Sequence, residues 1–427
     1  MRVCLYEDAK FGQLEPLNLT RPVFDLICGR TSLARKQRDY FNTSDMGALV
    51  RHYLADLVAE QNPAWHVNDL DWLCAGKTIL VNGRWLPPSQ FHGNPETPHI
   101  GMSEGQIAYL VVDASDLRSC HFDNLTECLE SWQLSLPKFP AGGQWIEYPW
   151  DLVELATSEL VRDFTNYPLS LPDFQTTESL HIIGSRENLI IAASATVEPL
   201  VVFDTTNGPI TVEENVHISA FSRIEGPCHI GPNTQIHGAK IRGGCYFGPQ
   251  CRIGGEVEAT IIHGYTNKYH EGFLGHGYLG EWINLGAGTH NSDLRNDYDE
   301  VSVIMQGVKI ATGQKKVGCF IGDHTKTGLG TLLNTGTNIG PFCNVLPSAG
   351  FAPKYVPGFT TFWKGQLRET SPIPQLLKSA QKVMDRRGQV LTDVYRETYG
   401  KVYDETALVR LRALHREEKS RVMAKSA

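Results

Sequence analysis

The sequence lacks a long apolar run, a paired cysteine motif and an excess of positive charge. In 427 residues, no stretch is apolar throughout over the roughly 18 residues that a membrane-spanning helix needs. The N-terminal residues MRVCLYEDAKFG have no apolar segment of a secretory signal. The ten cysteines are scattered without a CxxC pair, which favours reduced thiols. We therefore expect a cytoplasmic protein with no membrane partner.

The charge balance narrows the class of partners further. There are 39 lysine and arginine residues against 47 acidic residues, which gives a net charge of −8. A nucleic-acid-binding surface usually needs a basic excess, so we expect no nucleic acid partner, whereas a local phosphate pocket stays compatible with this balance. The length predicts two domains and an appendage.

The second half of the sequence repeats with a period of six residues. The two strict series are Val212, Ile218, Ile224, Ile230 and Ile236, and then Ile321, Thr327, Leu333, Ile339 and Val345. This period predicts a triangular β-helix with one hexapeptide on each face, because each inward side chain then stacks on its equivalents in neighbouring coils. A β-sandwich, the alternative, would alternate with period two.

The changes in pattern divide the chain into three segments. Residues 1–178 mix short apolar runs with helix-like stretches and predict an α/β, Rossmann-like domain. Residues 179–368 hold the repeats and predict the parallel β-helix. Residues 369–427 are rich in helix formers and predict a helical extension.

Two stretches of the β-helix carry a family resemblance. Residues 269–293, YHEGFLGHGYLGEWINLGAGTHNSD, resemble the acetyltransferase half of the bifunctional enzymes that make UDP-N-acetylglucosamine. Residues 321–340, IGDHTKTGLGTLLNTGTNIG, are similar to a divergent branch of that family, the sugar nucleotidyltransferases with a short first domain. The resemblance implies a nucleotidyltransferase-like domain, a left-handed β-helix and a homotrimer with acetyl-transfer sites between subunits.

The resemblance also implies roles for single residues. His270 aligns with the family's general base, the histidine that takes a proton from the glucosamine amine as this amine attacks acetyl-CoA. His276 is the next candidate for the general base. Asn284 matches the contact to the amino sugar. Ala287 and Gly288 match the backbone beside the acetyl-CoA thioester.

Two other interpretations of these histidines stay open. A histidine in a β-helix turn is often only a solvated residue. Zinc ligands are the other alternative, although the spacing does not favour them, and that set would be His263, His270, His276 and His290.

The family's phosphate contact is missing from its usual position. Its lysine aligns with Glu258. The hexapeptide repeat is interrupted between Asn291 and Val317 by a segment that we call the excursion. Loops that leave a rigid scaffold often carry binding groups, so we expect the excursion to cover the acetyl-transfer site. Lys315 and Lys316 near its end are candidates for the phosphate contact, and two solvated lysines are the alternative.

The first domain carries a second resemblance. Residues 3–36 are similar to the first strand, loop and helix of a sugar nucleotidyltransferase, through LEPLNLTRP at 14–22 and CGRTSL at 28–33. This resemblance implies that the domain takes a nucleoside triphosphate and a sugar-1-phosphate.

Three cations are candidates for phosphate binding in this domain. The glycine-rich loop of the family is absent, so we expect Arg21, Arg30 and Lys36 to supply the contacts to nucleotide phosphates. The alternative is that the two arginines pair with acids such as Glu15 and Asp25.

The expected magnesium site is poorly supported. The family's magnesium-binding aspartate follows a strand, and the best counterpart is ILVNGRWLP at 79–87, where Arg84 replaces it. Magnesium prefers oxygen ligands and a cation repels it. We therefore predict no metal ligand, and Mg²⁺ is expected only if nucleotidyl transfer operates.

The combined prediction is a transferase of nucleotide-sugar synthesis. It would be a sugar-1-phosphate nucleotidyltransferase, an acetyl-CoA-dependent amino-sugar-1-phosphate N-acetyltransferase, or both. One alternative is an acetyltransferase whose first domain only binds nucleotide or a regulatory ligand. The other is a non-catalytic β-helix scaffold.

Overall fold

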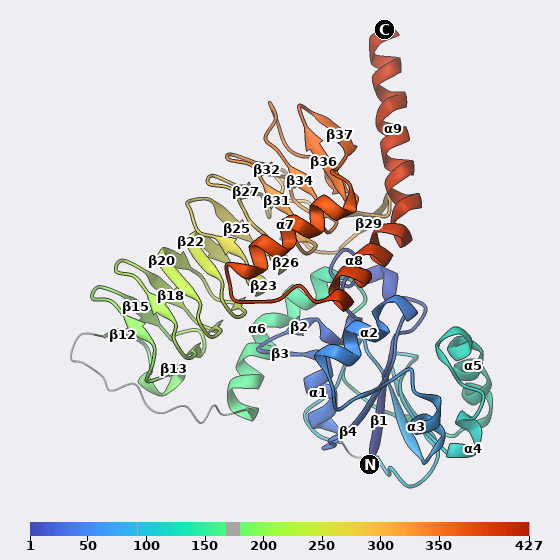
Figure 1. Cartoon of the computed structure of the whole chain (residues 1–427). Coiled ribbons are helices and arrows are strands. Elements are labelled where there is room, and N and C mark those ends of the chain that lie inside the picture. Colours follow the sequence, from blue (N-terminus) through green and yellow to red (C-terminus); the bar gives the residue numbers. More distant parts are fainter. Residues whose placement is uncertain (92, 168–179, 427) are drawn as a thin grey trace.

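A computed structural model describes residues 1–91, 93–167 and 180–426 (Figure 1). A mixed α/β domain is followed by a β-helix and by C-terminal helices, as predicted. The boundary expected between residues 178 and 179 lies outside the described residues, and the one expected after residue 368 falls within β37 (Gln366–Glu369). Within the described ranges, no helix has the length and apolar character to cross a membrane.

The first domain is built on a seven-stranded sheet. In spatial order its strands are β10 (Lys138–Pro140), β8 (His99–Ser103), β9 (Gln106–Val112), β6 (Thr78–Asn82), β1 (Arg2–Tyr6), β4 (Asp45–Leu49) and β5 (His66–Val67). β6, β1, β4 and β5 run parallel, whereas β9 is antiparallel to both β6 and β8. The sheet is therefore mixed, and its four parallel strands share one carboxyl edge.

Helices cover both faces of this sheet. Alternate residues of β1 point to opposite sides, so that Val3 and Leu5 pack in one core and Cys4 and Tyr6 in another. The helices are α1 (Leu33–Tyr40), α2 (His52–Gln61), α3 (Leu70–Cys74), α4 (Ala114–Leu117), α5 (Leu125–Ser135) and α6 (Pro149–Asn166). Of these, α1 and α2 contribute to the first core, and α3, α4 and α5 to the second.

The β-helix has three faces of short parallel strands. The first face holds β13 (Leu189–Ile191), β16 (Ile210–Val212), β19 (Cys228–Ile230), β21 (Cys245–Phe247), β23 (Ile261–Gly264), β26 (Tyr278–Glu281), β30 (Cys319–Ile321), β33 (Thr337–Ile339) and β35 (Tyr355–Val356). The second holds β14 (Thr196–Val197), β17 (His217–Ile218), β24 (Asn267–Lys268), β31 (Lys326–Thr327), β34 (Asn344–Val345) and β36 (Thr360–Trp363). The third holds β12 (His181–Ile183), β15 (Val202–Asp204), β18 (Arg223–Glu225), β25 (Phe273–Gly275), β27 (His290–Asn291) and β32 (Leu332–Leu333). Two longer strands, β20 (Gln235–Ile241) and β22 (Arg252–Glu258), bend from the second face into the third.

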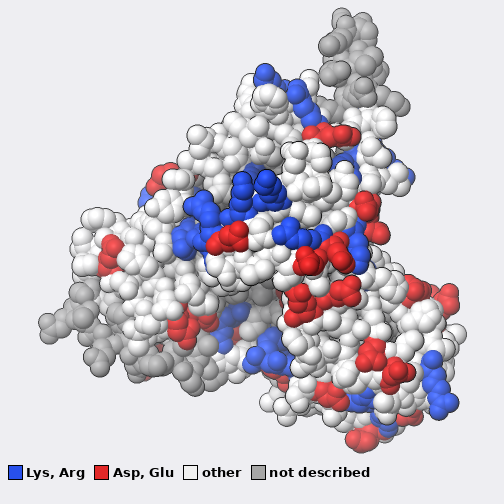
Figure 2. Space-filling view, viewed as in Figure 1, with Lys and Arg blue, Asp and Glu red and all other residues white. Residues whose placement is uncertain are grey.

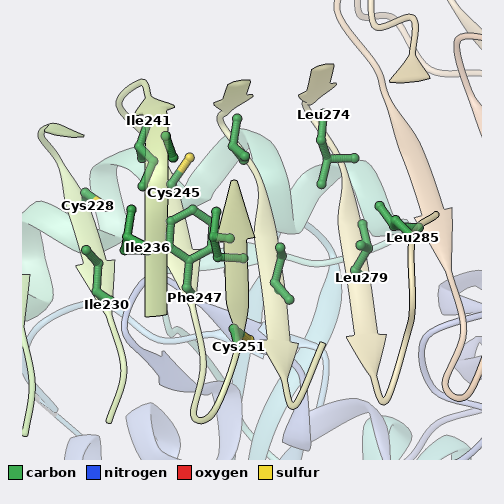
Figure 3. Packing of buried hydrophobic residues seen from close by; sticks show 14 of the residues in the cluster. Cys228, Ile230, Ile236, Ile241, Cys245, Phe247, Cys251, Leu274, Leu279 and Leu285 are labelled. Atoms are coloured by element: carbon green, nitrogen blue, oxygen red, sulfur yellow. The ribbon is translucent and has the colours of Figure 1, made fainter. Parts of the chain in front are cut away.

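The hexapeptide residues form the interior of the β-helix. Ile230, Ile236 and Phe247 are fully buried and stack with their equivalents from neighbouring coils (Figure 3). Five of the ten cysteines join this interior as free thiols, as small apolar side chains do. The one-dimensional core predicted from the six-residue period is confirmed.

The other two parts of the chain cover two sides of the β-helix. Tyr246, Tyr278 and Phe320 of the first face pack against α6 and the loops of the first domain. Aromatic residues at the corner between the first and second faces stack in a ladder, and this ladder packs against α7 (Ile373–Asp385) and α8 (Asp393–Glu405). The last helix, α9 (Ala407–Ser426), contacts β37, and its far end projects beyond the β-helix (Figure 1).

The excursion at 291–317 packs on both the first domain and the β-helix. It forms a hairpin of β28 (Ser302–Met305) and β29 (Val308–Ala311), and Val303 and Met305 join a core with Leu14 of the first domain. On the β-helix side, Asn338 Nδ2 of β33 donates to the Ile304 carbonyl at 3.2 Å. The expectation that the excursion covers the acetyl-transfer site stays a prediction.

Candidate functional site

A large cavity lies beside the carboxyl ends of β1 and β4. Its volume is about 1300 Å³, and it is lined by the loop 9–16, by Arg51 and His52 at the start of α2, by the hairpin tip around Gln306, and by residues of α8 and α9. In open α/β sheets, ligands bind at this edge. The first domain therefore has a site large enough for a nucleotide, and the β-helix hairpin and the C-terminal helices help to enclose it.

The carboxylates at this edge are already paired with arginines. Glu7 accepts hydrogen bonds from Arg51 at 2.9 and 3.0 Å, and Asp8 accepts from Arg84 Nε at 2.9 Å and Nη2 at 2.5 Å. Burial alone would raise the pKa of Asp8, but the hydrogen bond and charge of Arg84 outweigh it and hold that pKa below its usual range. Both pairs are thus neutral units of carboxylate and guanidinium.

These residues do not fit a magnesium ion. The buried Arg84 occupies the strand-end position where oxygen ligands would be needed, and its charge opposes a cation. In the described part of the chain, no group of three or more His, Cys, Asp or Glu side chains is placed to hold a metal. Arg84 instead pairs with Asp8, and the absence of a metal ligand stays a prediction.

Arg21 lies between domains, not in the large cavity. Its Nη2 is 2.6 Å from Asp323 Oδ2 and 3.4 Å from Glu281 Oε2, both on the β-helix. It lines only a small cavity of about 180 Å³ at the junction with the C-terminal helices. Two carboxylates therefore neutralise the guanidinium, and a role in phosphate binding is left as a prediction without support from this geometry.

Arg30 and Lys36 are held by α6. The backbone amide of Arg30 donates to Asp163 at 2.7 Å, and the Lys36 ammonium pairs with Asp163 and with Glu159 at 2.9 Å. Lys36 is almost fully buried. Arg21 and Lys36 are thus paired with acids, whereas the Arg30 guanidinium donates to the Tyr167 carbonyl. Phosphate binding by these three cations stays a prediction.

Four predicted residues of the β-helix lie on one corner. His270 is exposed in the turn 269–272 between the second and third faces, and Ala287 and Gly288 occupy the same turn one coil further on. The Gly288 amide donates to the Glu271 carbonyl at 3.0 Å, which fixes the stacking of the two turns. Asn284 is exposed on the strand that leads into this corner.

This corner, hereafter the free corner, is left uncovered by the other described parts of the chain. The first domain packs on the first face and the C-terminal helices pack on another corner. Large apolar side chains are exposed along it, namely Leu200, Phe221, Tyr269 and Leu329. Large apolar side chains exposed along one corner favour a role of this corner as a contact surface.

His276, Lys315 and Lys316 lie at a different corner, between the third and first faces. The His276 Nδ1 is 2.7 Å from Asp293 Oδ2, and burial would raise the pKa of Asp293, but the His276 hydrogen bond and charge hold it below its usual value. Strand β25 separates this corner from His270, a span of roughly 10 Å. The two predicted histidines of one subunit therefore belong to two separate places.

The lysines of the excursion are near the predicted phosphate position but differ in their contacts. Lys316 Nζ lies 3.1 Å from Glu258 Oε1, the residue that replaces the family's lysine. Lys315 is exposed. Lys316 thus neutralises Glu258, and a contact of either lysine with phosphate stays a prediction.

Two functional features were not found from the sequence. Asp293 orients His276 through contact between coils, and no sequence spacing singles it out. A buried lysine, Lys268, donates to the carbonyls of Gly254 and His270 at 2.7 Å each, and burial lowers its pKa to about 8. The His270 backbone is thus held by a neighbouring side chain.

Comparison with known proteins relates the chain to sugar nucleotidyl transferases and to bifunctional transferases. Residues 3–168 match the model of the family described as sugar nucleotidyl transferase. The bifunctional sugar-1-phosphate nucleotidylyltransferase/acetyltransferase of Sulfurisphaera tokodaii is 32% identical over 150 residues, which cover 33% of this chain and 36% of that protein. The bifunctional protein GlmU of Synechococcus elongatus is 27% identical over 229 residues, which cover 45% of each.

The chain therefore spans less than half the length of either relative. Among solved structures, a mutant of AntD, an N-acyltransferase from Bacillus cereus, in complex with dTDP and coenzyme A, covers 50% of this chain and 100% of its own at 11% identity, with a TM-score of 0.19. Residues 3–168 thus match the sugar nucleotidyl transferase family, and the chain is a distant homologue of the bifunctional sugar-1-phosphate nucleotidylyltransferase/acetyltransferases, with a β-helix after its first domain.

Proposed function

We propose that the protein is an acyl-CoA-dependent N-acyltransferase that acts on an amino sugar carried as its phosphate or nucleotide derivative, acetyl-CoA being the acyl donor. The observation that carries this proposal is the gathering of His270, Asn284, Ala287 and Gly288 on the one corner that the other domains leave uncovered. These residues match the family's acetyl-transfer motif, and relatives with both activities support the assignment.

His270 is the proposed general base. Its imidazole is exposed, while its backbone carbonyl is held by Lys268. The imidazole takes a proton from the amine as the nitrogen attacks the thioester carbon, a nitrogen–carbon bond forms, and the carbon–sulfur bond breaks. The proton then passes to the departing thiolate, so coenzyme A leaves as the free thiol. Because the Gly288 amide donates to the Glu271 carbonyl, the backbone amide of Ala287 is the proposed donor to the developing oxyanion.

Asn284 and the trimer complete the proposed site. An exposed carboxamide can donate to and accept from sugar hydroxyls, and Asn284 already accepts from Asn267 Nδ2 at 3.2 Å. A second subunit that packs on the exposed apolar side chains of the free corner would bury the site. A closed cyclic assembly of three subunits suits the triangular cross-section of the β-helix. The site then lies between subunits.

His276 is a second candidate for the base, on a specific observation. Asp293 holds its Nδ1 and leaves Nε2 for a substrate proton, the arrangement that makes a histidine an oriented base. It lies at another corner, so the two histidines can be tested separately.

For the first domain, we propose nucleotide or nucleotide-sugar binding in the large cavity. Nucleotidyl transfer is the second candidate function, favoured by the family match. No step through magnesium is derived, because Arg84 and Asp8 neutralise each other at the edge of the sheet. A binding role that delivers or senses the sugar nucleotide fits this chemistry better.

The experiment is an acceptor-dependent assay of thiol release from acetyl-CoA. Glucosamine-1-phosphate and amino-sugar nucleotides are offered in turn, and N-acetylglucosamine-1-phosphate with UTP and Mg²⁺ is offered separately. We expect thiol release with an amino-sugar acceptor. A folded protein that releases thiol with none of them contradicts acyl transfer and favours the scaffold.

A further inference from the structure

A strip of positive charge runs beside the proposed acyl-transfer corner. Arg252, Asn267, Asn284 and Lys326 follow one another in register on the second face, so neighbours lie one strand spacing apart, roughly 4.8 Å. Arg387, just after α7, reaches this face and donates through Nη2 to Asn267 Oδ1 at 2.7 Å. These five residues are here named the cationic strip.

The C-terminal helices build one side of the cationic strip. The Gln250 side chain donates to the Arg387 carbonyl at 3.4 Å, which ties the end of α7 to the β-helix. Arg386 and the α7 lysines Lys378 and Lys382 are exposed alongside, and lysine and arginine side chains gather over α7 in Figure 2. The helical extension therefore supplies charge that the β-helix alone does not have.

The cations of the strip lack acidic partners. Among the described residues, no carboxylate forms an ion pair with Arg252, Lys326 or Arg387, whereas Arg21, Arg51, Arg84 and Lys36 are each paired. Burial lowers the pKa of Arg252, and the charge of Arg387 lowers it further. Like charges held together without counter-charge favour the binding of an anion.

The chemistry of the strip favours phosphate. Two half-buried guanidinium groups and an ammonium offer forked donors and more than one positive charge, which suits a phosphate dianion better than a single carboxylate. Asn267 and Asn284 add amide donors between the cations. His270 follows Asn267 by three residues, so the strip lies about 10 Å from the proposed base.

We propose that the cationic strip binds a phosphate group of a substrate at the free corner. This proposal rests on the proposed acyl transfer, and it supplies the phosphate contact that Glu258, paired with Lys316, cannot make. The phosphate belongs either to the acyl donor, as coenzyme A, or to the amino-sugar acceptor. In both cases the C-terminal helix α7 is part of the substrate site.

The test combines binding and kinetics on the full chain. Calorimetry measures the Kd of adenosine 3′,5′-bisphosphate, UDP and inorganic pyrophosphate for the parent and for the double variant Arg252→Gln/Arg387→Gln. We expect at least one probe to bind the parent and to bind the variant about tenfold more weakly or worse, because charged hydrogen bonds are lost. The matched control is Arg242→Gln, whose arginine pairs with Glu256 and Glu258 on the third face.

The kinetic arms distinguish the source of the phosphate. A KM raised only for acetyl-CoA assigns the strip to the donor, and a KM raised only for the phosphorylated acceptor assigns it to the acceptor. Equal Kd values in parent and double variant, or no binding of any probe to the parent, would overturn the proposal. Because calorimetry needs no turnover, probe binding that depends on the strip in a protein without thiol release would refute the acyl transfer alone.

Discussion

Arg21 of the first domain and Asp323 of the β-helix form a buried ion pair, with 2.6 Å between Nη2 and Oδ2. Glu281 lies 3.4 Å from the same nitrogen, and the Arg21 charge holds the pKa of Glu281 near 2 although burial alone would raise it. The pair joins two domains whose contacting residues are 302 positions apart in sequence.

Removal of this arginine should destabilise the protein. Arg21→Ala leaves two buried carboxylates without a counter-charge, and breaking such a pair costs about 3–5 kcal/mol. Chemical denaturation should show this loss, and Arg21→Met/Asp323→Asn should recover part of it. If Arg21→Ala leaves the free energy of unfolding unchanged and weakens nucleotide binding, Arg21 binds a nucleotide phosphate and the ion pair does not stabilise the fold.

The hexapeptide period predicted the β-helix well, because its determinants are local. Each inward residue, such as Ile224 or Ile339, is fully buried at the position that the repeat assigns. His270 and Ala287 share a corner because residues about one coil apart in a regular solenoid stack.

Partners that depend on distant packing were not predictable. The acids that pair with Lys36 and accept from the Arg30 amide come from α6, more than a hundred residues later. The hairpin at 302–311 packs on both the first domain and β33, and its own sequence does not encode these contacts. Arg387 shows the same limit, because only docking of α7 brings it to Asn267.

His324 should make stability fall in acid. It stacks between Trp282 and Phe342, and burial lowers its pKa to about 3. The unfolded chain binds a proton below about pH 6.5 while the folded protein does not, so each such group lowers the free energy of unfolding by about 1.4 kcal/mol per pH unit between these two pKa values.

Urea denaturation at about pH 7 and about pH 5 checks this. The variant His324→Phe should lose part of the acid slope, and His181→Phe, at an exposed position, should keep it. An equal slope in the parent and the His324 variant would show that this histidine is protonated in the folded state.

The free corner should hold subunits together. Phe221 is 76% exposed and Leu329 is 71% exposed, so a second copy seated there would bury both. Light scattering should give a trimer for the parent and a smaller mass for Phe221→Glu/Leu329→Glu. Leu134→Glu, at a site 91% exposed on α5, is the matched control and should stay trimeric. A monomeric parent would refute the shared site.

Nucleotide binding in the large cavity should not need a divalent cation. Arg84 already neutralises Asp8, and its charge opposes a divalent cation at this edge of the sheet. Calorimetry with a panel of nucleoside diphosphates should give Kd values that agree within about twofold in EDTA and in Mg²⁺. Binding that appears only with Mg²⁺ would contradict the assignment of this ion pair.

The central claim is acyl transfer by His270 at the free corner, and the most direct measurement is kcat for thiol release from acetyl-CoA in His270→Ala and His276→Ala. We predict that His270→Ala lowers kcat by about 10²–10⁴ with little change in KM, while His276→Ala stays close to the parent. A His270→Ala protein that is folded, trimeric and fully active would contradict the claim, and a loss confined to His276→Ala would move the base to the His276–Asp293 pair.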